Sequence, residues 1–84
     1  MPTSCKETIL LKGKQTYVGL VSKINPIPTE DSQFSWMLKK LGLIIFVRTN
    51  VPQACKTMET NNNMFGYSKN PWNNERSCGG SSGG

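Results

Sequence analysis

Apolar residues in the middle of the chain recur at the spacing of one helical face. Four of them stand at positions i, i+3, i+4 and i+7, namely Phe34, Met37, Leu38 and Leu41. This pattern predicts an amphipathic helix over about residues 31–41, with the apolar stripe packed in a core. Thr29 or Asp31 can cap its first turn, and Gly42 suits the left-handed residue that ends many helices.

A continuous apolar run follows this helix at once. Leu43 to Val47 contains β-branched and aromatic residues, which predicts a strand over about residues 43–48 that is buried on both faces. A helix, a glycine and a buried strand make half of an α/β unit, so the expected fold class is α/β. Functional groups in such sheets lie just past the carboxyl end of a strand. Residues 49–53 are therefore expected at the rim of a site.

The remaining segments carry weaker patterns. Residues 16–21 read as a short strand or an extended loop, residues 25–28 as a break in the chain, and residues 54–63 as a short helix or a loop. From Thr60 to Gly84 the apolar side chains are few: Met64, Phe65, Tyr67, Trp72 and Cys78. That half needs a neighbour to pack on, so the chain reads as a piece of a larger enzyme domain.

The charge balance raises the question of a nucleic-acid partner. The 84 residues contain ten Lys and Arg against five Asp and Glu, a net charge of +5. Phosphate binding needs a basic stripe or patch, whereas here the positive residues are dispersed and Lys39-Lys40 is the single adjacent pair. A nucleic-acid-binding module is the weakest hypothesis, and we expect no nucleic-acid partner.

The cysteines do not predict a metal site. Cys5, Cys55 and Cys78 are widely spaced, and the chain has no histidine, so we expect no metal ion, no cofactor and no disulfide framework. A reducing compartment follows, either cytoplasmic or at an intracellular membrane. No apolar run approaches the length of a membrane span. Cys78 lacks a histidine to take its proton, so we interpret it as a small packing residue.

Two places in the chain have both a structural and a functional interpretation. The terminal Gly/Ser run, residues 79–84, is either a flexible linker or a tight turn that presents two hydroxyls. Lys6 is either a surface lysine or a lysine held neutral by burial, which could act as a base. Composition by itself favours the plain interpretation of each.

Four motifs taken together change that balance. They are Thr49-Asn50-Val51-Pro52-Gln53, Phe65-Gly66, Asn70-Pro71-Trp72-Asn73 and Gly79-Gly80-Ser81-Ser82-Gly83-Gly84. In this order and spacing the chain resembles the amidase-signature serine hydrolases from Pro2 to Gly84. The Asn-Val-Pro-Gln form points to the fatty acid amide hydrolase branch rather than to the glutamyl-tRNA amidotransferase A subunit. The resemblance implies a mixed-sheet α/β/α fold, of which residues 1–84 would be a partial domain that ends before the nucleophile.

The resemblance also implies roles for individual residues. Lys6 corresponds to the family's catalytic lysine, and Ser81 to its bridging serine, whose preceding peptide bond is cis in the family. Gly79, Gly80 and Ser82 correspond to the supporting turn. The implied chemistry is a Ser–Ser–Lys triad, in which neutral Lys6 takes a proton from Ser81 and Ser81 takes one from an attacking serine.

In the family that attacking serine lies beyond the position of Gly84. The sequence therefore predicts part of an amide hydrolase that is inactive by itself and whose full-length form acts on lipid-like or other amides. Some relatives contact membranes, but nothing in this segment indicates where. Cys78 replaces a proline common among relatives, which would loosen the entry to the turn. The alternative is a truncated, non-catalytic product or an interaction piece.

Overall fold

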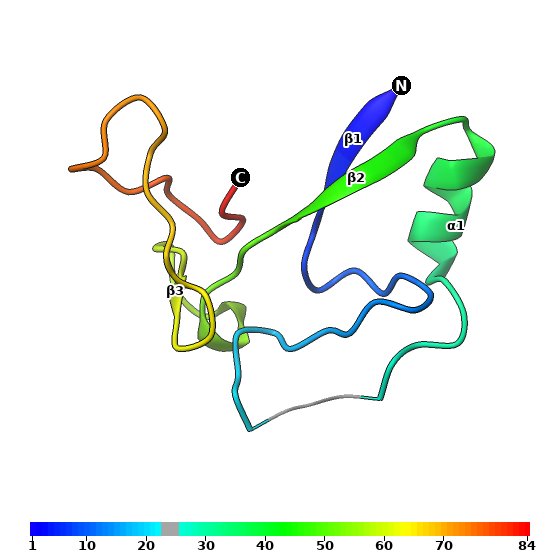
Figure 1. The fold of residues 1–84 in the computed structure, drawn as a ribbon, viewed down its shortest axis with the longest axis horizontal. Helices are drawn as coiled ribbons and strands as arrows, with labels where there is room; N and C mark the ends of the chain where they lie inside the picture. Colours follow the sequence, from blue (N-terminus) through cyan, green and yellow to red (C-terminus); the bar gives the residue numbers. More distant parts are fainter. Residues whose placement is uncertain (23–25) are drawn as a thin grey trace.

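The computed structural model describes residues 1–22 and 26–84 and has the expected α/β architecture (Figure 1). Asn25, at the start of the predicted chain break, lies outside the described residues. The elements in order are strand β1 (Pro2–Lys6), helix α1 (Gln33–Lys40), strand β2 (Ile44–Thr49), the short 3-10 helix η1 (Gln53–Cys55), strand β3 (Asn61–Asn62) and strand β4 (Gly66–Tyr67).

The two longer strands form a parallel pair, with α1 in the connection between them. β1 and β2 lie side by side in Figure 1, and α1 is next to β2. The register pairs Pro2 with Ile44 and Lys6 with Thr49, with an irregularity between Thr3 and Ser4. Because the strands are parallel, both carboxyl ends reach the same edge of the sheet. That edge carries Lys6 and Thr49.

The first turn of α1 is capped by a residue other than those predicted. Ser32 is the N-cap, and its hydroxyl accepts a hydrogen bond from the backbone N–H of Ser35 at 3.3 Å. The proposed cap Asp31 stands one position too early and instead pairs with Lys39 at 2.5 Å. Thr29 is not the cap either. Ser32 is the cap because its side chain reaches a backbone N–H of the first turn that has no partner within the helix.

The end of α1 follows the prediction. Gly42 has a φ of 81°, and its N–H bonds to the carbonyl of Lys39 at 3.0 Å. The N–H of Leu43 bonds to the carbonyl of Leu38 at 3.1 Å, which completes a Schellman motif. No helix in the described part of the chain is long and apolar enough to cross a bilayer.

The predicted burial of the helix stripe and of the strand is wrong, although both elements are present. Phe34 and Leu41 on α1 are 53 % and 73 % exposed, and Ile44 and Phe46 on β2 are 66 % and 70 % exposed. Within residues 1–22 and 26–84 the sheet has two long strands, and the shortest extent is 16 Å. Such a thin layer cannot cover both faces of β2. The buried apolar side chains among the described residues are Cys5, Leu11, Val51 and Pro52.

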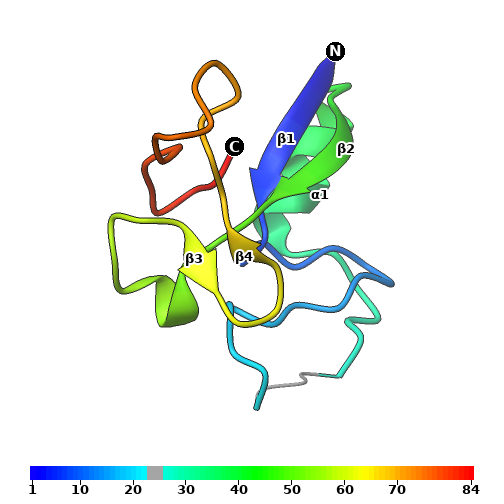
Figure 2. The ribbon, with the colours of Figure 1, turned by 60° about the vertical axis from the view of Figure 1, so that its left-hand side comes forward.

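The weakly patterned segments are mostly loop. Residues 16–21 contain turns and no strand, which matches the extended-loop alternative. Residues 54–63 do not form the short helix: Ala54 and Cys55, the last two residues of η1, have φ angles of 52° and 55°, which no right-handed helix continues. β3 and β4 then form a small antiparallel hairpin, which Figure 2 shows beside the end of β2.

Candidate functional site

The carboxyl end of β1 meets the terminal glycine turn. Nζ of Lys6 lies 2.6 Å from Oγ of Ser81, within hydrogen-bond distance. Both residues are half-buried. The interpretation of Lys6 as a base predicted a buried lysine, so Lys6 is less enclosed in this chain than predicted. The two residues to which the resemblance assigned catalytic roles are therefore in direct contact.

The glycine turn is an ordered structure and not a linker. Gly79 has a φ of 80°, and the peptide bond between Gly80 and Ser81 is cis, as the resemblance implied. The hydroxyl of the fully buried Thr60 donates to the carbonyl of Gly79 at 2.9 Å. A Cβ atom on Gly80 would overlap the carbonyl oxygen of Met58, so this position accepts no side chain.

The segment after β2 holds the other end of the turn. The hydroxyls of Thr49 and Ser82 lie 2.6 Å apart, and the N–H of Gly83 bonds to the carbonyl of Asn50 at 2.8 Å. The sequence placed residues 49–53 at a site rim because they follow a strand. The first two of them do contact the turn that carries Ser81.

The buried amide of Asn62 braces this rim. Asn62 is 3 % exposed, and its side-chain N–H₂ donates to Oδ1 of Asn50 at 2.6 Å and to the carbonyl of Val51 at 2.7 Å. Its Oδ1 accepts from the N–H of Phe65 at 2.8 Å. Asn50 in turn donates to Oγ of Ser68 at 2.9 Å. Satisfied networks of this kind fix a loop in one conformation.

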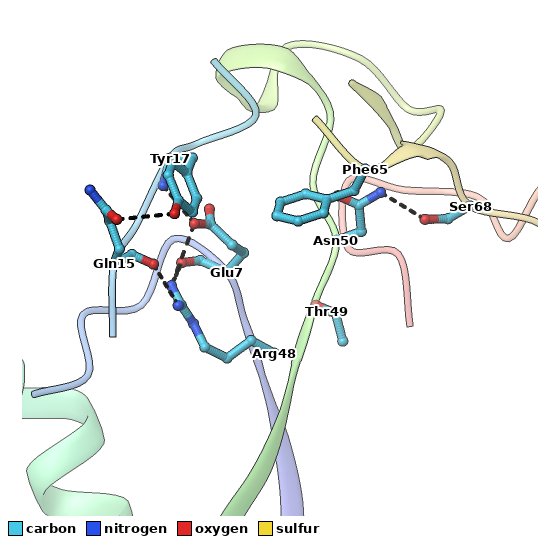
Figure 3. Close-up of a pocket in the computed structure, with 8 residues that line it drawn as sticks. All are labelled: Glu7, Gln15, Tyr17, Arg48, Thr49, Asn50, Phe65 and Ser68. Atoms are coloured by element: carbon cyan, nitrogen blue, oxygen red, sulfur yellow. Dashed lines mark hydrogen bonds and ion pairs between the residues drawn. The ribbon is translucent and has the colours of Figure 1, made fainter. Parts of the chain in front are cut away.

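A pocket of about 410 Å³ lies beside the rim (Figure 3). It is lined by Glu7, Gln15, Tyr17, Arg48, Thr49, Asn50, Phe65 and Ser68. In Figure 3, Glu7 and Arg48 lie across the pocket from Phe65 and Asn50. Thr49 and Asn50 thus border both this pocket and the turn.

Glu7 and Arg48 form an ion pair on one wall of the pocket. Glu7 is 6 % exposed, and its carboxylate accepts from the N–H groups of Tyr17 at 2.6 Å and Val18 at 3.0 Å. Arg48 lies 3.5 Å from the same carboxylate and donates to the carbonyl of Gln15 at 2.7 Å. It also bonds to the carbonyl of Glu7. A buried charge is stable only when it is paired, so Glu7 and Arg48 stay together. Their contacts hold the loop after β1 against β2.

The cysteines are all free thiols. Burial raises the pKa of the Cys5 thiol above its ordinary value of 9.0, although the positive charge of Arg48 opposes this shift. Cys78 is half-buried, and its thiol donates to the carbonyl of Gly79 at 3.3 Å, as suits a small packing residue. The described residues contain no group of three or more His, Cys, Asp or Glu side chains that could hold a metal ion.

The chain matches known proteins over its whole length. The family model described as Amidase matches residues 1–84. The chain belongs to the amidase family. It is 45 % identical to fatty acid amide hydrolase 1 of Caenorhabditis elegans and 43 % identical to an acetamidase of Emericella nidulans, in each case over the whole chain. A solved structure of a fatty acid amide hydrolase superimposes on 99 % of the chain with a TM-score of 0.92 and 42 % identity.

The matches cover only a small part of those amidases. The chain spans 15 % of each of the two relatives and 15 % of the solved structure. The resemblance to amidase-signature hydrolases and the α/β fold are confirmed.

Sequence reasoning missed several residues that build this amidase segment. Thr60, Glu7 and Arg48 were given no role, although Arg48 is the charged residue at the end of an apolar strand and could have suggested a partner. Thr49 appeared only as part of a rim. Nothing in the sequence signals Thr60, because a threonine in a polar stretch has no distinctive pattern.

Proposed function

We propose that Lys6 and Ser81 are the base and the bridging hydroxyl of a Ser–Ser–Lys triad in an amidase that cleaves carboxylic amides. The observation that carries this proposal is the 2.6 Å contact between Nζ of Lys6 and Oγ of Ser81. Gly79, Gly80 and Ser82 support the turn that presents Ser81. The attacking serine belongs to another part of the domain, so these 84 residues are inactive by themselves.

The proton path follows from this contact. Neutral Lys6 takes the hydroxyl proton of Ser81, and Ser81 takes the proton of the attacking serine as that oxygen bonds to the amide carbon. The proton then returns to the amine that leaves, and water hydrolyses the acyl-enzyme. No histidine is needed, in keeping with a chain that has none.

The substrate class is a carboxylic amide. The relatives are named for different amides, an acetamidase on one side and fatty acid amide hydrolases on the other. A lipid-like amide is the narrower proposal, supported by the fatty acid amide hydrolase that superimposes on 99 % of the chain. Membrane contact is possible for the full-length enzyme and is not shown by this segment.

A chimeric enzyme tests the proposal directly. These 84 residues would replace the matching segment of the C. elegans fatty acid amide hydrolase 1, which is 45 % identical over that length. The chimera should hydrolyse amides, and Lys6→Ala should lower kcat by about 10²-fold or more, since it removes a general base. Lys12→Ala, at an exposed lysine, is the matched control and should retain full activity. An inactive chimera, or Lys6→Ala turnover equal to that of the parent chimera, would refute the assignment.

A second candidate is a non-catalytic interaction piece. Phe34, Leu41 and Phe46 are all more than half exposed in these 84 residues, a surface that either a partner or the rest of a larger domain would cover. Sequencing the gene on both sides of these residues separates the two candidates. A continuous reading frame with a further serine-containing glycine turn supports the enzyme, and stop codons at both ends support the interaction piece.

A further inference from the structure

We infer that Thr49 is a positioning residue, which holds the turn of Ser81 at the end of β1 and so keeps the hydroxyl of Ser81 against Lys6. The catalytic consequence of this inference rests on the proposed function. The geometric part does not, because it concerns a contact that can be measured without turnover.

The backbone of Thr49 is tied to the strand of the lysine. Thr49 is the last residue of β2 and stands opposite Lys6 in the parallel register. Its carbonyl accepts the N–H of Glu7, the residue after Lys6, at 3.1 Å. The position of Thr49 relative to Lys6 is therefore set by the sheet.

The side chain of Thr49 is tied to the turn. Its Oγ1 lies 2.6 Å from Oγ of Ser82, the neighbour of Ser81. Its Cγ2 methyl occupies the space beside Gly84, where a Cβ atom would overlap it. Branching at Cβ restricts χ1, and in the conformation present the hydroxyl and the methyl both face the turn. Thr49 thus connects the strand that carries Lys6 to the turn that carries Ser81.

Thr60 anchors the opposite side of the same turn. It is fully buried, its hydroxyl donates to the carbonyl of Gly79, and the same oxygen would lie 3.2 Å from a Cβ on Gly80. Ser81 therefore follows a segment fixed by Thr60 and precedes a segment fixed by Thr49. Loss of the Thr49 hydroxyl removes the side-chain hydrogen bond to Ser82 and leaves the segment after Ser81 held by the backbone bond from Gly83 to Asn50.

Acetylation of the lysines by acetic anhydride tests this inference in the 84-residue chain itself. Peptide mass spectrometry gives the rate at Lys6 relative to the exposed lysines Lys12 and Lys69. Ser81→Ala should raise the relative rate at Lys6 severalfold, because the amine loses its partner. Thr49→Val, which keeps the shape and removes the hydroxyl, should raise it similarly, and Thr49→Ser should restore the parent rate.

Two results would overturn the inference. One is a Thr49→Val chain that protects Lys6 as well as the parent does. The other is a Ser81→Ala chain with unchanged labelling, since the contact that Thr49 is inferred to hold would then be absent in solution. A general loosening of the fold is recognised by faster alkylation of the buried thiol of Cys5, since the exposed Lys12 and Lys69 react freely in either case.

The chimeric enzyme separates this inference from the proposed function. There Thr49→Val should lower kcat about tenfold with little change in KM, the loss expected for one hydrogen bond that aligns a reacting group, and Thr49→Ser should restore it. Full turnover with Lys6→Ala together with the expected labelling would refute the function and leave the positioning role intact. Loss of turnover with Lys6→Ala but unchanged kcat and labelling with Thr49→Val would refute the positioning role alone.

Discussion

Lys6 and Ser81 are 75 positions apart in the sequence, and the fold brings Nζ of one to 2.6 Å from Oγ of the other. The contact forms where β1 ends, at the edge of the sheet shared with the end of β2. Each partner is held by a different element, the lysine by the parallel strand pair and the serine by a braced glycine turn. The pair therefore depends on the tertiary arrangement of both ends of the chain.

Ser81→Ala in the chimeric enzyme should slow acylation by about 10²-fold or more, because the proton path to Lys6 loses its intermediate hydroxyl. The rate of labelling by a fluorophosphonate probe measures this step. Ser22→Ala, at an exposed serine, is the control and should label at the parent rate. Labelling of Ser81→Ala as fast as the parent would remove Ser81 from the relay.

The 84-residue chain by itself should not react with a fluorophosphonate probe and should melt over a broad range. Among the described residues the buried apolar side chains are Cys5, Leu11, Val51 and Pro52, whereas Trp72 is 94 % exposed. So small a core supports little cooperativity. Calorimetry tests the prediction of broad melting. A sharp transition with equal calorimetric and van't Hoff enthalpies would contradict it.

The thiol of Cys5 should react more slowly than those of Cys55 and Cys78. Cys5 is 6 % exposed, and burial raises its pKa, so less thiolate is present at neutral pH. Iodoacetamide alkylation followed by peptide mass spectrometry gives the three rates. We expect Cys5 to be slower by about tenfold or more in the native chain, and the three rates to converge in denaturant. Equal rates in the native chain would show that β1 does not shield this thiol.

Asp31 should titrate below its ordinary pKa of 3.8. The hydrogen bond from the Lys39 ammonium lowers the pKa of this carboxyl, and the bond from the backbone N–H of Lys12 lowers it further. Because the folded-state pKa is the lower one, the ionised carboxylate stabilises the fold above pH 3.8. That contribution is lost as the pH falls from 3.8 through the folded value.

NMR titration of the Asp31 carboxyl carbon measures this shift. Lys39→Met should move the midpoint back toward 3.8, and Lys40→Met, at the neighbouring lysine, should leave it in place. A midpoint at or above 3.8 in the parent chain would mean that the Lys39–Asp31 pair does not form in solution.

Local patterns were enough to locate the main elements. The four apolar residues at helical spacing, the glycine after them and the β-branched run predicted α1, its left-handed end at Gly42 and β2 to within a few residues. These features depend on neighbours within a few positions, so the sequence contains all of their causes. The motifs were also sufficient to identify the amidase family, because their residues and spacing are read directly from the chain.

The burial of those elements and the contacts of the site were decided by the tertiary structure. Whether Phe46 is covered depends on how many layers surround β2, which its own sequence cannot show. The contact of Thr49 with Ser82 spans 33 positions and that of Arg48 with Glu7 spans 41. Contacts over such separations form only when the strand register and the glycine turn bring the partners together, so no local pattern encodes them.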